Sequence, residues 1–167
     1  MPPVPPPPIP PRRDALGGIV ITSLLGPATT RQGYEKQFFP GIDVGLPGWE
    51  RAHSQGAGTG KESPHAIRYA PAEVNQQWQR LGIERFLREL FKSKGPGVDL
   101  VLTTVTYTHP GTLRLKEIQY RVDARKAGRM QPLFEAAIEV GDSKVNPKVA
   151  GSVIIRTPEN LWPKYLV

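Results

Sequence analysis

The sequence predicts an α+β domain in which a central helix packs on an antiparallel sheet of about four strands. Three observations carry this prediction. Apolar residues recur at helical spacing over about residues 72–93, β-branched residues alternate with polar ones in several runs between residues 98 and 156, and a proline–glycine turn joins the first two runs. The 167-residue chain also contains three Trp, five Tyr and five Phe, which is enough to bury a single hydrophobic core.

The chain begins with a proline-rich segment. Of its 19 prolines, eight lie between residues 2 and 11. Such a composition is typical of polyproline II, an extended conformation without internal hydrogen bonds. We therefore predict a linker over residues 1–13 and a single domain over residues 14–167, with a first strand near residues 17–25.

A stretch of about 40 residues, from 26 to 65, shows neither helical nor strand periodicity and is rich in glycine. Aperiodic segments of this length are uncommon inside a compact domain and often carry function. This one contains His53 and His65, two of the three histidines. We therefore expect a long glycine-rich functional loop.

The predicted helix begins near Pro71, because proline suits the first turn of a helix and the acidic Glu73 complements its positive end. Trp78 and Leu81 continue the helical spacing, and the apolar positions change phase after Gly82. We therefore expect a helix over about residues 72–93 that is bent or broken near this glycine.

The rest of the sheet is expected at residues 98–108, 113–124, 134–140 and 153–156, followed by an extended cap at residues 157–167. Pro110 and Gly111 stand where a type II turn prefers them, so the first two strands form a hairpin.

One irregularity is expected in the second strand of this hairpin. Leu115 and Ile118 are both apolar, yet their spacing would place them on opposite faces of a straight strand. A β-bulge near Lys116 and Glu117 brings both to the same face.

The composition excludes several kinds of chemistry. The absence of cysteine excludes disulfides, cysteine-ligated metals and thiol nucleophiles. The chain has no apolar run of membrane-spanning length and does not begin like a signal peptide. Its 22 Lys and Arg against 15 Asp and Glu give a net charge of +7, which favours anionic partners such as nucleic acid.

The candidate site is the segment from residue 48 to 76, where side chains suited to acid–base chemistry gather. Histidine can exchange a proton near pH 7, and arginine can stabilise negative charge. We expect the catalytic groups to be Arg51, His53, Ser54, Glu62 and His65. We expect the substrate to contact Trp49, Gln55, Arg68, Asn75 and Gln76.

A catalytic zinc site fits this sequence poorly. His53, Glu62, His65 and His109 carry suitable ligand atoms. However, Pro64 separates Glu62 from His65, so the pair does not have the helical arrangement of the HExxH motif. We therefore expect no metal and no cofactor.

Two other motifs are superficial. Residues 56–62 resemble a phosphate-binding P-loop, but Glu62 occupies the position at which Ser or Thr would bind magnesium. Ser54 lacks the nucleophile elbow that a Ser-His-Asp hydrolase requires.

Metal-independent cleavage of RNA is the reaction that these groups suit best. The 2′-hydroxyl needs a base, the leaving 5′-oxygen needs an acid, and the phosphorane needs a cation.

Structural roles stay open for some of the same residues. Arg51 and Glu62 can form an ion pair that fixes the loop, Trp49 can belong to the core, and His109 can be a turn residue.

Three phrases of the sequence resemble a family of bacterial toxin domains, polymorphic toxin type 4. They are LPGWERAHSQG at residues 46–56, TGKESPHAIRYAPAEVNQ at 59–76 and TTVTYTHPGTLRLKEIQYRV at 103–122. The resemblance covers about residues 46–150. It implies the C-terminal toxin domain of a large secreted protein, such as a type VI secretion effector, used in competition between bacteria.

The resemblance also implies partners and a place of action. It implies a cognate immunity protein, which the basic charge of the chain leads us to expect to be acidic. It further implies a delivery module before the proline-rich linker, export without a signal peptide, and action in the cytoplasm of the target cell.

Two other activities remain open. An ADP-ribosyltransferase that modifies RNA or protein would need NAD, an Arg or His to hold it, and a Glu near the nicotinamide ribose; Arg51 or His53 could serve together with Glu117. A non-enzymatic toxin would instead bind and block an anionic target. NAD dependence distinguishes the ADP-ribosyltransferase from a ribonuclease. Variants of Arg51, His53 and Glu62 that fold and stay fully toxic would indicate the non-enzymatic toxin.

Overall fold

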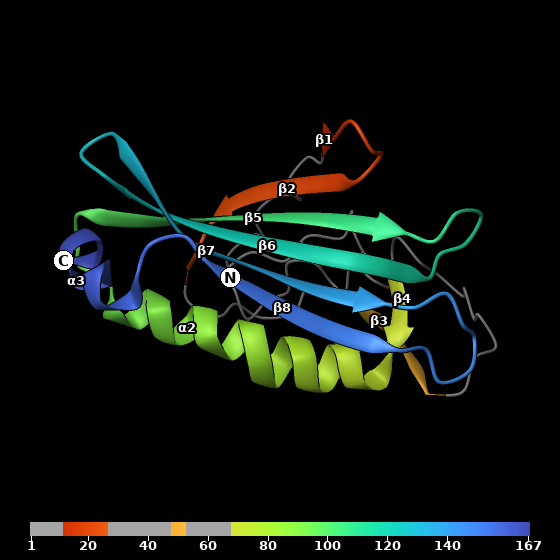
Figure 1. The fold of residues 1–167 in the computed structure, drawn as a ribbon. Coiled ribbons are helices and arrows are strands. Elements are labelled where there is room, and N and C mark those ends of the chain that lie inside the picture. Colours follow the sequence, from red (N-terminus) through yellow and green to blue (C-terminus); the bar gives the residue numbers. More distant parts are fainter. Residues whose placement is uncertain (1–11, 27–47, 53–67) are drawn as a thin grey trace, which may run out of the picture.

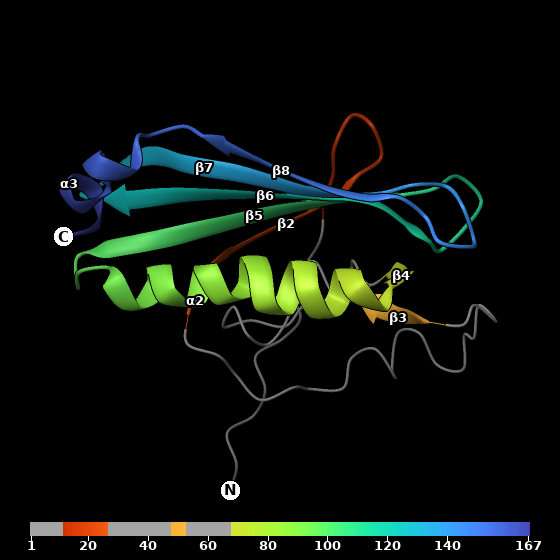
Figure 2. The same cartoon turned by 60° about the horizontal axis from the view of Figure 1, so that its bottom comes forward.

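One long helix lies along one face of a six-stranded antiparallel sheet in the computed structural model (Figures 1 and 2). The structure describes residues 12–26, 48–52 and 68–167. It confirms the α+β class, and the main sheet has six strands where the sequence predicted about four. In their order across the sheet these are β1 (Arg12–Arg13), β2 (Ile19–Leu24), β5 (Val98–Thr108), β6 (Leu115–Lys126), β7 (Arg129–Val140) and β8 (Val149–Ile155).

The edge of the sheet begins inside the segment predicted as a linker. Arg12 and Arg13 form β1 and pair with Val20 and Ile19 of β2. The prolines of residues 1–11 lie outside the described residues.

A second, two-stranded sheet has its first strand inside the segment predicted as one long loop, residues 26–65, and its second strand just after that segment. It consists of β3 (Trp49–Ala52) and β4 (Arg68–Pro71), which pair antiparallel from Trp49 opposite Pro71 to Ala52 opposite Arg68. An isolated parallel bridge between Tyr69 and Arg114 joins β4 to the start of the main sheet's β6. Strands of four residues among glycines carry too little alternation to be recognised in the sequence.

The helix runs without a break through Gly82, so the predicted bend or break is wrong (Figure 2). Its first part, η2 (Val74–Ile83), is π-helical and its second part, α2 (Glu84–Ser93), is α-helical. The N–H of Glu84, for example, donates to the carbonyl of Gln79, five residues earlier. Wider turns shift the phase of the helix. As a result Gln79 is buried, whereas Leu81, which the spacing had placed in the core, is exposed.

The predicted hairpin between β5 and β6 is confirmed. Gly111 has a φ of 70°, and the N–H of Thr112 donates to the carbonyl of His109 at 3.1 Å, which closes the turn. The bulge is also confirmed: Glu117 pairs with Tyr107 and Leu115 with Thr108, so Lys116 is the extra residue. Because of this bulge both Leu115 and Ile118 are buried.

The last residues form two short helices, η3 (Glu159–Leu161) and α3 (Trp162–Leu166), so the predicted extended cap is wrong. Pro163 suggested an extended chain, but proline is favourable in the first turn of a helix. The indole N–H of Trp162 donates to the carbonyl of Thr157 at 2.7 Å. Its ring stacks on Phe134 at 5.8 Å between centroids, so this segment completes one end of the core.

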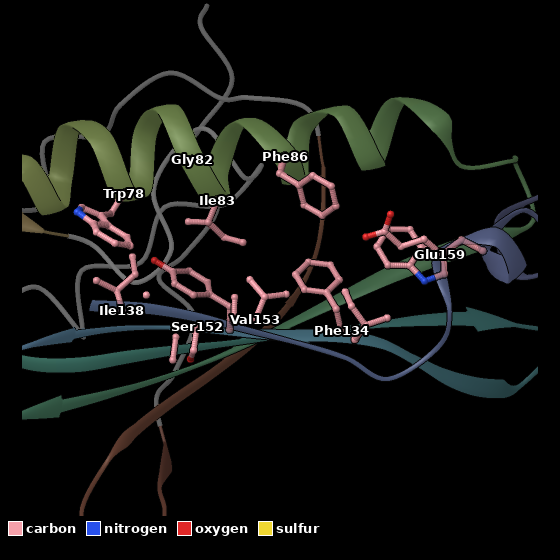
Figure 3. A pocket seen from close by; sticks show the side chains of 15 residues that line it. Trp78, Gly82, Ile83, Phe86, Phe134, Ile138, Ser152, Val153 and Glu159 are labelled. Carbon is pink, nitrogen blue, oxygen red and sulfur yellow. The ribbon is translucent and has the colours of Figure 1, made fainter. Parts of the chain in front are cut away.

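The hydrophobic core lies between the helix and the sheet, and it is not completely filled. An apolar cavity of about 520 Å³ opens between η2, α2 and the edge strand β8 (Figure 3). Trp78 lies over this strand so closely that a Cβ atom on Gly151 would be 2.2 Å from its ring. No helix in the described ranges is long and apolar enough to cross a membrane.

Candidate functional site

The small β3–β4 sheet and the start of η2 bring together part of the predicted site. Glu50, on β3, is half-buried, and both of its carboxylate oxygens accept hydrogen bonds. Asn75 Nδ2 donates to one oxygen and Gln76 Nε2 to the other, each at 2.8 Å. The two carboxamides therefore fix the orientation of a carboxylate.

Arg68 supplies the positive charge beside this sheet. Its Nε donates to Thr108 Oγ1 at 2.7 Å, which links β4 to the end of β5. Burial lowers the pKa of the Arg68 guanidinium, and the positive charge of Arg13 lowers it further. An arginine nevertheless stays protonated at neutral pH. The end of β5 therefore concentrates cationic charge at a partly desolvated position.

Three of the predicted substrate-binding residues lie on β3 and at the start of η2. Trp49 is half-buried on β3, opposite Pro71. Asn75 and Gln76 hold Glu50, so their amide groups serve to position this carboxylate.

The predicted catalytic residues are mostly outside the described part of the chain. The backbone of Arg51 lies on β3, opposite Tyr69. The other predicted site residues belong to residues 53–67, which connect β3 to β4 and lie outside the described ranges; they are His53, Ser54, Gln55, Glu62 and His65. Their roles remain predictions.

A polar cluster lies where the β5–β6 turn meets the end of β7. Arg114, only 9% exposed, donates from Nη2 to Asp142 Oδ1 at 2.7 Å. The ring of His109 is buried, and its Nε2 lies 2.9 Å from the carbonyl oxygen of Val140. His109 therefore ties the β5–β6 turn to the end of β7, in agreement with its interpretation as a turn residue.

Glu117 and the strand of Arg51 lie on different sides of the main sheet. Glu117 alternates with the buried Ile118 and faces away from the helix. The β3 strand lies on the helix side (Figure 2).

Glu50 is the candidate functional residue that sequence reasoning missed. It stands in the phrase Trp49-Glu50-Arg51, but its partners lie 25 and 26 residues later. Only the pairing of β3 with β4 reveals the contact. Within the described ranges no group of three or more His, Asp or Glu residues is placed to hold a metal ion.

A family model described as bacterial toxin 4 matches residues 46–136, which is more than half of the chain. This segment includes Glu50 with both of its partners, Arg68, and the β5–β6 hairpin. No curated protein and no solved structure matches the chain.

Proposed function

The chain belongs to the bacterial toxin 4 family, and from this premise we propose that it is the toxin domain of an antibacterial effector that cleaves RNA without a metal ion. Family membership makes it a bacterial toxin domain and makes an immunity protein its expected partner. The proposal adds the reaction, the substrate and the residues.

The observation that supports this reaction is the oriented carboxylate of Glu50. Each of its oxygens accepts one amide hydrogen bond and retains a further lone pair that can accept a proton. A base held in one orientation loses little entropy when it meets the 2′-hydroxyl of RNA. Glu50 is therefore our candidate for the general base.

Arg68 and the predicted histidines supply the remaining roles. In the proposed step the 2′-oxygen attacks phosphorus while its proton passes to Glu50. The bond from phosphorus to the 5′-oxygen breaks, and that oxygen takes a proton from His53 or His65. The Arg68 guanidinium stabilises the charge of the phosphorane. The products are a 2′,3′-cyclic phosphate and a 5′-hydroxyl.

The first experiment incubates the purified full chain with total bacterial RNA, with and without EDTA and NAD. Cleavage should persist in EDTA, need no NAD and leave 2′,3′-cyclic phosphate ends. It should weaken as the salt concentration rises, because phosphate contacts are screened. NAD consumption with a mass gain on RNA of unchanged length, or on protein, would establish ADP-ribosylation instead. Loss in EDTA that zinc or magnesium reverses would establish a metal site.

A pair of isosteric variants tests the role of Glu50. Glu50→Gln should reduce the rate of cleavage about 100- to 10,000-fold, because the amide cannot take the proton. Glu89→Gln is the matched control, since Glu89 is 63% exposed on α2 and pairs with Arg85 on the same helix. Equal activity of the two variants would remove Glu50 from the mechanism.

His53→Ala tests the sequence-based part of the site. We expect it to abolish toxicity while the thermal midpoint stays nearly unchanged. A loss of activity that follows a large fall in the midpoint would make the residue structural.

A further inference from the structure

The face of the main sheet that points away from the helix carries a groove of about 500 Å³, to which every one of the six strands contributes. We call it the outer groove. Its floor is one row of register partners that crosses the sheet from strand to strand. The row consists of Arg12, Val20, Val105, Gln119, Ala137 and Ser152.

The turn between β1 and β2 forms one wall of the outer groove and rises above the sheet in Figure 2. The carboxylate of Asp14 holds this turn: it accepts from the hydroxyl of Tyr107 at 2.5 Å and from the N–H of Gly18 at 2.6 Å. Gly18 lies directly against the floor, because a Cβ atom there would be 2.7 Å from both Tyr107 and Val105. The turn thereby fixes β1 at one end of the groove.

Two arginines and one carboxylate, that of Asp14, lie at this end of the groove, so its net charge is positive. Arg12 has no hydrogen bond or ion pair from its side chain to any described residue. Among the described residues Arg13 donates only to a carbonyl, that of Gly17, at 3.1 Å. Neither guanidinium therefore forms an ion pair within the described ranges.

Glu117 places a carboxylate in the same groove, three strands away from β1. Its Oε1 accepts from Gln119 Nε2 at 3.2 Å, and no described cation pairs with it. Other charges of the groove are compensated: Arg121 pairs with Asp123 at 3.1 Å, and Glu135 with Arg156 at 2.5 Å. The charges without an ion-pair partner among the described residues are thus the guanidiniums of Arg12 and Arg13 with the carboxylate of Asp14 at one end, and the carboxylate of Glu117 beyond an apolar stretch of floor.

We propose that the outer groove binds a ribonucleoside phosphate. Arg12 and Arg13 contact the phosphate, since guanidinium groups match its oxygens in charge and geometry. Glu117 accepts hydrogen bonds from the ribose hydroxyls, as acidic residues do in dinucleotide sites. Val105 provides the apolar surface between them.

Binding in the outer groove would extend the proposed function to substrate recognition. Only the choice of RNA as the source of the ligand rests on that proposed function. RNA and NAD both contain a ribose diol next to a phosphate, so the same chemistry would recognise either. Arg13 also lies near enough to Arg68 to lower its pKa. Because the outer groove and β3 lie on opposite sides of the main sheet, an RNA strand that reaches both must pass around an edge of the sheet.

Calorimetric titration of the full chain with 5′-AMP and 5′-dAMP tests the groove without any cleavage. AMP should bind about tenfold more tightly than dAMP, because the 2′-hydroxyl donates to a carboxylate. Glu117→Gln should weaken AMP binding about tenfold and abolish this preference. Arg12→Gln should weaken both ligands equally. The control variants are Glu89→Gln and Arg129→Gln, which change exposed residues outside the groove.

A second measurement needs no variant. In NMR spectra of the unaltered chain, AMP should shift the amide signals of Val105 and Gln119 and leave those of α2 unchanged. Absence of binding, equal binding of AMP and dAMP, or shifts confined to the helix side would overturn the proposal.

Competition with bound AMP identifies whether the natural ligand of the outer groove is RNA or NAD. Displacement of AMP by an RNA oligonucleotide, with no turnover of NAD, assigns the groove to RNA; binding and hydrolysis of NAD assigns it to NAD. AMP binding that depends on Glu117 in a chain that does not cleave RNA would support the groove and refute the ribonuclease. Cleavage without AMP binding would refute the groove alone.

Discussion

The orientation of Glu50 depends on side chains that need not touch the substrate. Gln76 and Gln77 are adjacent, exposed glutamines on η2, but only the first donates to Glu50. We expect Gln76→Ala to lower kcat about tenfold, with KM little changed, because the base loses one of its two supports. Gln77→Ala is the matched control and should keep full activity. Steady-state cleavage of a fluorogenic RNA measures both, and equal kcat values for the two variants would contradict the positioning role.

Another prediction at this scale concerns the hydrogen bond between Tyr107 and Asp14. It raises the pKa of Tyr107 to about 12 from the ordinary 10.0, with help from burial, and it lowers the pKa of Asp14 although burial opposes this. In the Asp14→Asn variant the pKa of Tyr107 should therefore return toward 10. Ultraviolet titration of tyrosinate, with Tyr107→Phe to assign the signal, measures the change. An unaltered titration would show that another group sets this pKa.

The same bond makes stability depend on pH at both extremes. The pKa of Tyr107 is higher in the folded chain, so its contribution is complete below about pH 10 and lost as the pH rises toward about 12. The pKa of Asp14 is lower in the folded chain, so its contribution is present above about pH 3.8 and lost in more acidic solution. Denaturant unfolding across this range should show both losses, and Asp14→Asn should reduce them.

At the scale of elements, Gly151 controls how closely β8 approaches the helix. Gly151→Ala would place a methyl group 2.2 Å from Cζ3 of Trp78, so the indole must move. We expect a loss of about 1–3 kcal/mol in the free energy of unfolding, together with a change in tryptophan fluorescence. Gly97→Ala is the control, because its added Cβ meets no atom within 4 Å. Equal stability of the two variants would mean that the indole relocates freely.

Elements whose evidence is local could be predicted from the sequence. The β5–β6 turn follows from Pro110 and Gly111, and the bulge follows from the opposed parity of Leu115 and Ile118. The phase change near Gly82 was visible too, but periodicity alone does not distinguish a broken helix from a π-helical one. The π-helical segment keeps the backbone hydrogen-bonded while it shifts the buried face, which a break would not do.

The candidate site depends on contacts between distant segments and was only partly predictable. Residue types suited to acid–base chemistry mark the segment from 48 to 76 in the sequence. The contact of Glu50 with Asn75 and Gln76 requires β3 and β4 to pair first. Four-residue strands have little intrinsic preference for pairing, and here the bridge from Tyr69 to Arg114 and the packing against the main sheet supply it.

At the scale of the whole molecule, expression of the chain in a bacterial cytoplasm should arrest growth, and co-expression of the cognate immunity protein should restore it. The +7 charge leads us to expect an acidic partner that associates rapidly at low salt. Colony counts and stopped-flow association measure the two effects. Normal growth with soluble toxin present would contradict the assignment of a toxic activity to this chain.

Removal of residues 1–11 is a second test at this scale. A polyproline segment has no internal hydrogen bonds, so its loss should leave the thermal midpoint and the RNA cleavage unchanged. Deletion through residue 18 should behave differently, because it removes β1 and the turn that Asp14 holds. AMP binding should then be lost, and the midpoint should fall. Identical behaviour of the two deletions would show that this turn has no role.

The outermost strand of the sheet has a consequence for the protein in concentrated solution. On β8 the side chains of Val153, Ile154 and Ile155 are 65%, 50% and 43% exposed, and among the described residues this strand pairs with β7 alone. An uncovered edge with apolar side chains is a template for strands of other molecules and favours aggregation. The fraction of the protein that stays soluble should therefore fall as the total concentration rises. Val153→Lys should raise the highest concentration that stays soluble, since a charged edge opposes intermolecular pairing.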